Sequence, residues 1–108
     1  MNKFEAVLLF SPELPSKTLL TEITKFKKQI SDNTGNVINE ENWGLRDLSY
    51  NINKFKKAFY NFFQIEISGN SLDKIKKDLN QSDDILRYIF IKVDSHQELP
   101  TKMNDEKK

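Results

Sequence analysis

The side chains that could perform catalysis are few and far apart in this chain of 108 residues. Its single histidine, His96, lies near the carboxyl end, where no predicted element can orient it. Glu40-Glu41 and Asp83-Asp84 are adjacent carboxylates, and such neighbours point apart instead of sharing a proton. There is no cysteine, and the three glycines are too widely spaced for a phosphate-binding loop: Gly35, Gly44 and Gly69. These observations disfavour an enzyme and indicate no metal site and no cofactor.

Basic and aromatic residues are interleaved between Leu45 and Tyr60. This stretch holds four basic residues among large apolar side chains, and its one acidic residue is Asp47. The basic residues are Arg46, Lys54, Lys56 and Lys57. Cations beside an aromatic surface can hold phosphates while bases stack on the rings, so the pattern favours contact with RNA. A second basic run, Lys74-Lys76-Lys77, is interpreted as the solvated surface of a helix.

The spacing of apolar residues predicts six elements in the order β-α-β-β-α-β. Strands are expected at residues 4–11, 37–50, 55–68 and 85–93, the second broken or bulged at Gly44 and joined to the third through 51–53. One helix should begin with Ser16 as its N-cap and end at 33–36, where a glycine or asparagine readily takes the left-handed conformation. Residues 69–71 should cap the second helix. The two apolar stripes are Leu19, Ile23, Phe26 and Ile30, then Leu72, Ile75 and Leu79.

This order predicts an α+β, ferredoxin-like fold, in which two helices cover one face of a four-stranded antiparallel sheet. The predicted strands nevertheless carry large apolar residues on both faces: Tyr60 and Phe62 oppose Phe59 and Phe63, and Tyr88 and Phe90 oppose Ile89 and Ile91. Only one set can lie under the helices. The other set either forms an exposed apolar patch that binds a partner, or is covered by loops or by the tail.

The composition fits one small domain followed by a polar tail. Residues 1–94 carry all six predicted elements, whereas residues 95–108 are polar, aperiodic and predicted to be disordered. The net charge of +1 argues against a generic polyanion binder, because counterion release requires a concentrated basic surface. No apolar run could span a membrane and no signal-peptide profile is present, so a cytoplasmic location is expected.

The stretch from Trp43 onwards resembles the bacterial small-subunit ribosomal protein six family. The family pattern is Trp-Gly, a basic residue, Leu-Ala-Tyr-Pro-Ile and a lysine-rich turn into an aromatic strand. The residues that fall on it are Trp43, Gly44, Arg46, Leu48, Tyr50, Ile52 and Lys54. Two further segments, Ser11-Pro12-Glu13 and residues 83–88, are similar to family segments, so the resemblance covers about residues 3 to 94. The chain departs from the family at Asn51, where the family has proline.

The resemblance implies a structural constituent of the small ribosomal subunit. Such a protein binds the central domain of 16S ribosomal RNA together with small-subunit ribosomal protein eighteen, as a heterodimer. The implied phosphate contacts are Arg46, Lys54, Lys56, Lys57 and Arg87. The implied contacts with the protein partner, or supports for them, are Trp43, Leu48, Tyr50, Ile52, Tyr60 and Tyr88. Other roles stay open: Trp43 could be partly structural, Tyr50 could pack inside the hairpin, and Arg87 could pair with Asp83 or Asp84.

Two other classes of protein share the predicted strand order. An RNA-recognition module that binds single-stranded RNA has an aromatic third strand, which residues 56–63 superficially resemble. Its glycine is missing here, however, and the first strand has no matching aromatic motif beyond Phe4 and Phe10. A ferredoxin-like small-molecule sensor would need a pocket with convergent polar groups, and the sequence supplies none.

Overall fold

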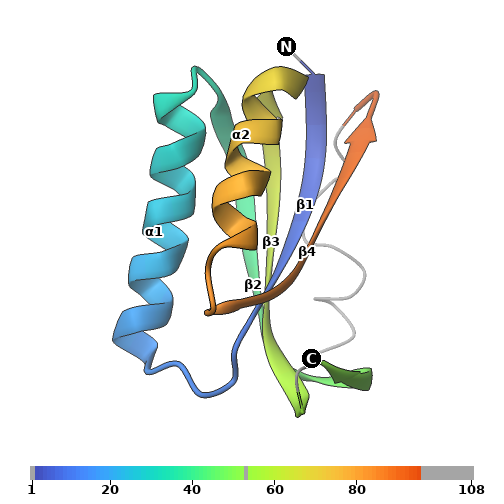
Figure 1. Ribbon diagram of the computed structural model, residues 1–108. Coiled ribbons are helices and arrows are strands. Elements are labelled where there is room, and N and C mark those ends of the chain that lie inside the picture. Colours follow the sequence, from blue (N-terminus) through green and yellow to red (C-terminus); the bar gives the residue numbers. More distant parts are fainter. Residues whose placement is uncertain (1, 53, 96–108) are drawn as a thin grey trace.

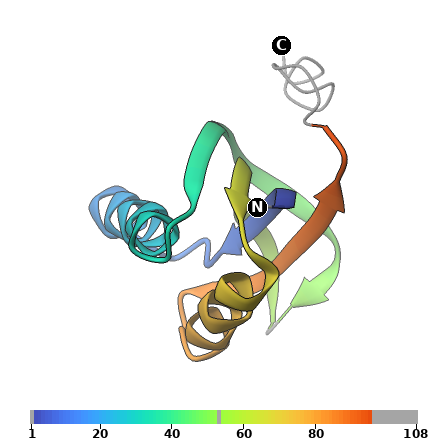
Figure 2. The same ribbon diagram turned by 90° about the horizontal axis from the view of Figure 1, so that it is seen from above.

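The computed structural model describes residues 2–52 and 54–95 and contains the six predicted elements in the predicted order (Figure 1). They are β1 (Asn2–Phe10), α1 (Ser16–Asp32), β2 (Asn36–Ile52), β3 (Phe55–Ile67), α2 (Gly69–Asn80) and β4 (Ile85–Val93). The strands form one sheet in the order β2-β3-β1-β4, and every neighbouring pair is antiparallel. Figure 2 shows both helices on the same side of the sheet. The α+β, ferredoxin-like prediction is therefore confirmed. His96 and the predicted tail beyond Ser95 lie outside the described residues.

The core lies between the two helices and one face of the sheet. Alternate residues of β1 enter it, and both predicted helical stripes are buried against them. Phe26 of α1 packs on Phe63 of β3 with ring centroids 4.9 Å apart. The contributions of β1 and the helices are Phe4, Ala6, Leu8, Phe10, Leu19, Ile23, Phe26, Ile30, Leu72, Ile75 and Leu79. Hydrophobic periodicity therefore identified most of this core correctly.

Three element boundaries differ from the prediction. Ser16 is the first helical residue of α1, and the N-cap is Pro15, which has no side-chain capping hydrogen bond. In α2 the cap is Ser68, whose hydroxyl oxygen accepts from the Ser71 backbone N–H at 3.2 Å. Strand β2 runs on to Ile52, which pairs directly with Phe55, so residues 51 and 52 belong to the strand and not to the predicted connection.

Helix α1 ends in a Schellman motif whose left-handed residue is Thr34, not the expected glycine or asparagine. Thr34 has φ 62°, and its N–H donates to the Ser31 carbonyl at 3.1 Å. The Gly35 N–H donates to the Ile30 carbonyl at 2.8 Å, which completes the motif. Gly35 is required for a different reason: a Cβ there would lie 2.8 Å from the backbone oxygen of Glu66. The glycine permits a close approach between the helix end and β3.

Replacing Gly35 with alanine should therefore lower the free energy of unfolding by about 1–3 kcal/mol, because a backbone atom cannot easily move away from the new methyl group. Urea denaturation measures this loss. Gly69→Ala is the matched control, because a Cβ at Gly69 has no neighbour within 4 Å. Equal denaturation midpoints for the two variants would show that the approach of Gly35 to β3 imposes no constraint.

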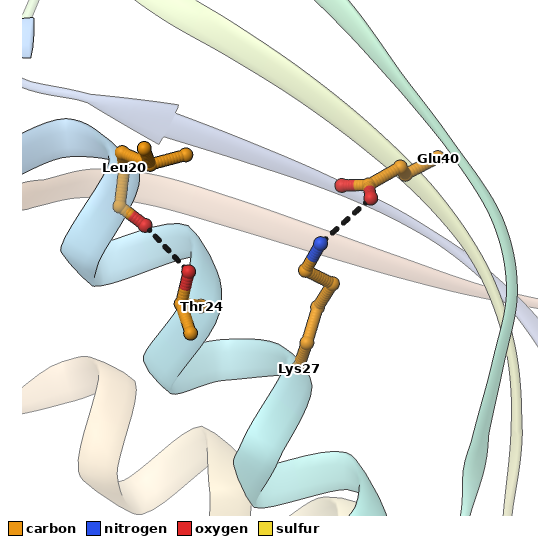
Figure 3. A network of polar contacts seen from close by, with 4 residues as sticks. All are labelled: Leu20, Thr24, Lys27 and Glu40. Carbon is orange, nitrogen blue, oxygen red and sulfur yellow. Dashed lines mark hydrogen bonds and ion pairs between the residues drawn. The ribbon is translucent and has the colours of Figure 1, made fainter.

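An ion pair on the surface joins helix α1 to the edge strand β2. Lys27 reaches from α1 to Glu40, with 2.7 Å between Nζ and Oε1 (Figure 3). One turn earlier in the helix, the Thr24 hydroxyl donates to the Leu20 carbonyl at 2.9 Å. Both charged groups of the pair are partly exposed, so it contributes at most about 1 kcal/mol. Glu40 thus faces α1, whereas its neighbour Glu41 accepts a hydrogen bond from Trp43, and the two carboxylates have separate partners.

Candidate functional site

The sheet face that the helices leave uncovered carries a second group of apolar side chains. Paired residues of neighbouring strands lie on the same face, so the strand register decides which residues belong to it. Val7 pairs with Phe62 and with Ile89, and Leu9 pairs with Tyr60 and with Arg87. The other set packs against the core under the helices: Phe59, Phe63, Tyr88 and Phe90. The register thus shows which of the two sets of strand residues lies under the helices and which lies on the open face.

Trp43 covers part of this open face from a β-bulge. The register of β2 against β3 shifts between Asn42 and Gly44, and Gly44 has φ 78°, which confirms the predicted irregularity. The Trp43 ring stacks on Phe62 with centroids 5.2 Å apart and an interplanar angle of 9°. Its Nε1–H donates to Glu41 Oε1 at 3.0 Å. Trp43 is 8% exposed and Phe62 only 3%, so both rings belong to a small core on the open face.

The end of the β2–β3 hairpin turns onto the same face. The register moves from Asp47 paired with Lys57 directly to Ile52 paired with Phe55, so residues 48–51 have almost no partner on β3. This widened segment, with the strands beneath it, encloses a hollow of about 290 Å³. The hollow is lined by Val7, Leu9, Trp43, Leu48, Ser49, Tyr50, Ile52, Tyr60, Arg87 and Ile89. We call this surface the open-face hollow.

Five of the six predicted partner-contact residues line the open-face hollow: Trp43, Leu48, Tyr50, Ile52 and Tyr60. Tyr88 does not join them, because β4 turns its side chain towards the helices. Its hydroxyl donates to Asn80 Oδ1 at 2.9 Å, and its ring lies 5.6 Å from that of Phe90. The predicted contact residues did not include Val7, Leu9 and Ile89, which also line the hollow. The signal that could have found them is their alternation with core residues along β1 and β4.

Four of the five predicted phosphate-binding residues lie along the β2–β3 hairpin. Lys54 occupies the turn with φ 72°, and Lys56 is exposed on β3. Lys57 forms an exposed ion pair with Asp47 at 3.2 Å, which is too weak to exclude a phosphate. The Arg46 Nε–H donates to the Trp43 carbonyl at 3.0 Å. Arg87 is separate from these four: it lies on β4 and contacts the Tyr50 ring and hydroxyl.

Two other kinds of site are absent from the described part of the chain. Within residues 2–52 and 54–95, no group of three histidine, aspartate or glutamate side chains is placed to hold a metal ion. None of the helices in these ranges is long and apolar enough to cross a membrane. What the described residues offer is an apolar hollow beside a basic hairpin.

Comparison with known proteins decides the family. The family model of ribosomal protein S6 matches residues 3–92, which include nearly all of the six elements. The chain belongs to the ribosomal protein S6 family. The predicted family is thus confirmed, and it is a family of ribosomal structural proteins, not of enzymes.

Individual S6 relatives agree with this assignment. Small ribosomal subunit protein bS6 of Rickettsia felis is 30% identical over 103 residues, which cover 95% of this chain and 85% of the relative. The bS6 protein of Mesorhizobium japonicum is 34% identical over 103 residues, and there the match spans only 62% of the relative's length. The crystal structure of 30S ribosomal protein S6 from Thermotoga maritima has the same fold, with a TM-score of 0.81 at 20% identity over 85% of this chain and 87% of that one.

Proposed function

We propose that this chain is a structural constituent of the small ribosomal subunit, acts in the cytoplasm, and binds the central domain of 16S ribosomal RNA together with small-subunit ribosomal protein eighteen. The observation that carries the proposal is the open-face hollow, an apolar surface bordered by a basic hairpin. Such an arrangement suits simultaneous contact with a protein and with RNA, because buried apolar groups hold the protein while nearby cations neutralise phosphates.

The apolar part of the surface supports a protein partner. Ile89 and Ile91 are 46% and 58% exposed on β4, and Tyr50 is 60% exposed on the hairpin. Exposed aromatic and aliphatic side chains that surround a hollow are typical of the centre of a protein interface. Five of the predicted contact residues contribute to this surface, and Tyr88 would support it only from the opposite face of β4.

The basic part of the surface supports contact with RNA backbone. The side chains of Lys54, Lys56 and Lys57 extend from the hairpin turn and the start of β3, where they are exposed. Arg46 lies on the strand opposite them, next to the bulge. These four residues could bind phosphates while the hollow stays occupied by the partner protein. Because they are few, RNA binding by the isolated chain should be weak.

The structure argues against the RNA-recognition alternative. That class stacks bases on exposed aromatic rings of its two central strands. Here the central strand β1 presents Val7 and Leu9 on the open face, and Trp43 covers Phe62 of β3. The sensor alternative is also unsupported, because the open-face hollow is lined mainly by apolar side chains and lacks a convergent polar set.

The deciding experiment measures binding of the full chain to a fragment of the 16S central domain, with and without protein eighteen. We expect weak binding alone and tight, specific binding with the partner. Lys56→Gln should then reduce the salt slope by about one unit, whereas Lys74→Gln on the outer face of α2 should not change it. Tight binding to short single-stranded RNA without any partner would refute the proposal and favour the recognition module.

A further inference from the structure

Arg87 and Tyr50 connect the two opposite edges of the sheet. They are 37 positions apart in the sequence, and an Arg87 Nη1–H donates to the Tyr50 hydroxyl oxygen. The Arg87 guanidinium carbon also lies 5.5 Å from the centroid of the Tyr50 ring. Strands β2 and β4 are not neighbours, because β3 and β1 lie between them. The contact therefore spans the open face and does not belong to any strand ladder.

The segment that carries Tyr50 lacks the regular pairing with β3 that holds the rest of β2. Residues 48–51 fall in the gap between the Asp47–Lys57 pair and the Ile52–Phe55 pair, so the ladder to β3 is interrupted there. In Figure 2 the hairpin end lies on the side of the sheet opposite the helices, next to β4. Arg87 approaches it from β4, and both Arg87 and Tyr50 line the open-face hollow. Their contact thus forms part of the wall of the hollow.

We propose that Arg87 is a positioning residue, which holds the end of the β2–β3 hairpin over the open face and keeps the hollow in a form ready for its partner. Arginine suits this task because its planar guanidinium can donate a hydrogen bond and at the same time lie against an aromatic ring. This inference replaces the phosphate contact expected of Arg87 from the family resemblance. The expected effect of Arg87 on partner affinity rests on the proposed function. The role of Arg87 in holding the hairpin against β4 does not rest on it.

The first test uses the full chain alone. Amide hydrogen exchange over hairpin residues 45–59 is measured in Arg87→Ala, Arg87→Lys and the control Lys92→Ala, which removes another exposed cation of β4. Both Arg87 variants should exchange about 2- to 5-fold faster there, with no change in the β1 amides and none in the control. Unchanged hairpin exchange in Arg87→Ala would overturn the proposal. Tyr50→Phe should give part of the effect, and none when added to Arg87→Ala.

The second test measures binding to protein eighteen and 16S RNA as a function of salt. A positioning role predicts that Arg87→Ala and Arg87→Lys both weaken binding about 2- to 5-fold while the salt slope stays unchanged. A phosphate contact predicts a slope lower by about one unit in Arg87→Ala and recovery in Arg87→Lys, and that outcome would overturn the proposal. If the wild-type chain bound neither component, the proposed function would fail, and the exchange experiment would still decide the role of Arg87.

Discussion

Trp43→Ala is expected to lower the free energy of unfolding by about 3 kcal/mol, because it removes a nearly buried ring and leaves a space above Phe62. Trp43 is the single tryptophan of the chain, so far-ultraviolet circular dichroism must replace fluorescence as the probe of unfolding. Urea denaturation with this probe gives the free-energy difference.

Trp43→Phe separates stacking from hydrogen bonding. Phenylalanine can keep the parallel contact with Phe62 but lacks the N–H that Trp43 donates to Glu41. Trp43→Phe should therefore lower the free energy of unfolding by only about 1 kcal/mol, the usual contribution of one hydrogen bond. If both variants were as stable as the wild type, the rings of the open face would not form a cooperative part of the folded structure.

Ile89→Thr should weaken association with protein eighteen by about 2 kcal/mol or more, roughly 30-fold, if the open-face hollow lies at the centre of the interface. Ile89 is 46% exposed, and threonine keeps the β-branched shape that suits a strand. The free energy of unfolding should therefore change by about 0.5 kcal/mol or less. Isothermal titration calorimetry measures the affinity.

Ile38→Thr provides the matched control for Ile89. Ile38 is 43% exposed and also lies in an edge strand, but it does not line the open-face hollow. The same substitution there should leave the affinity unchanged. Equal losses from the two variants, or none from either, would place the interface elsewhere on the protein.

The fold was largely predictable because its elements repeat simple hydrophobic periods. The helical stripe from Leu19 to Ile30 and the alternation from Phe4 to Phe10 each identify a buried face without further information. Hydrophobic periods alone could not show which of Tyr60 and Tyr88 lies on the open face. Alternation sorts the residues of a strand into two sets, but only the register with neighbouring strands shows which set the helices cover. Of these two predicted contact residues, Tyr60 lines the hollow, whereas Tyr88 packs on the other face.

Features that depend on contacts between distant segments could not be predicted from the sequence. A glycine or asparagine within residues 33–36 was expected to take the left-handed conformation, but the role of Gly35 comes from the Glu66 backbone, which lies on β3. The contact between Arg87 and Tyr50 joins two edges of the sheet, and no local pattern indicates it. Local propensity acts over a few residues, whereas these features require the complete sheet.

The irregularities of β2 also affect how copies of the chain could associate with one another. An edge strand with free N–H and C=O groups can template a further strand, and so seed aggregation. Three register shifts interrupt β2, so a second chain could follow its edge over short distances only. Strand β4, the other edge, is shifted only at one end and exposes Ile89 and Ile91. Arg87 and Lys92 flank these isoleucines and are exposed, and charged side chains on an edge strand disfavour the addition of another strand. One edge of the sheet thus has an interrupted register, and the other carries exposed cations.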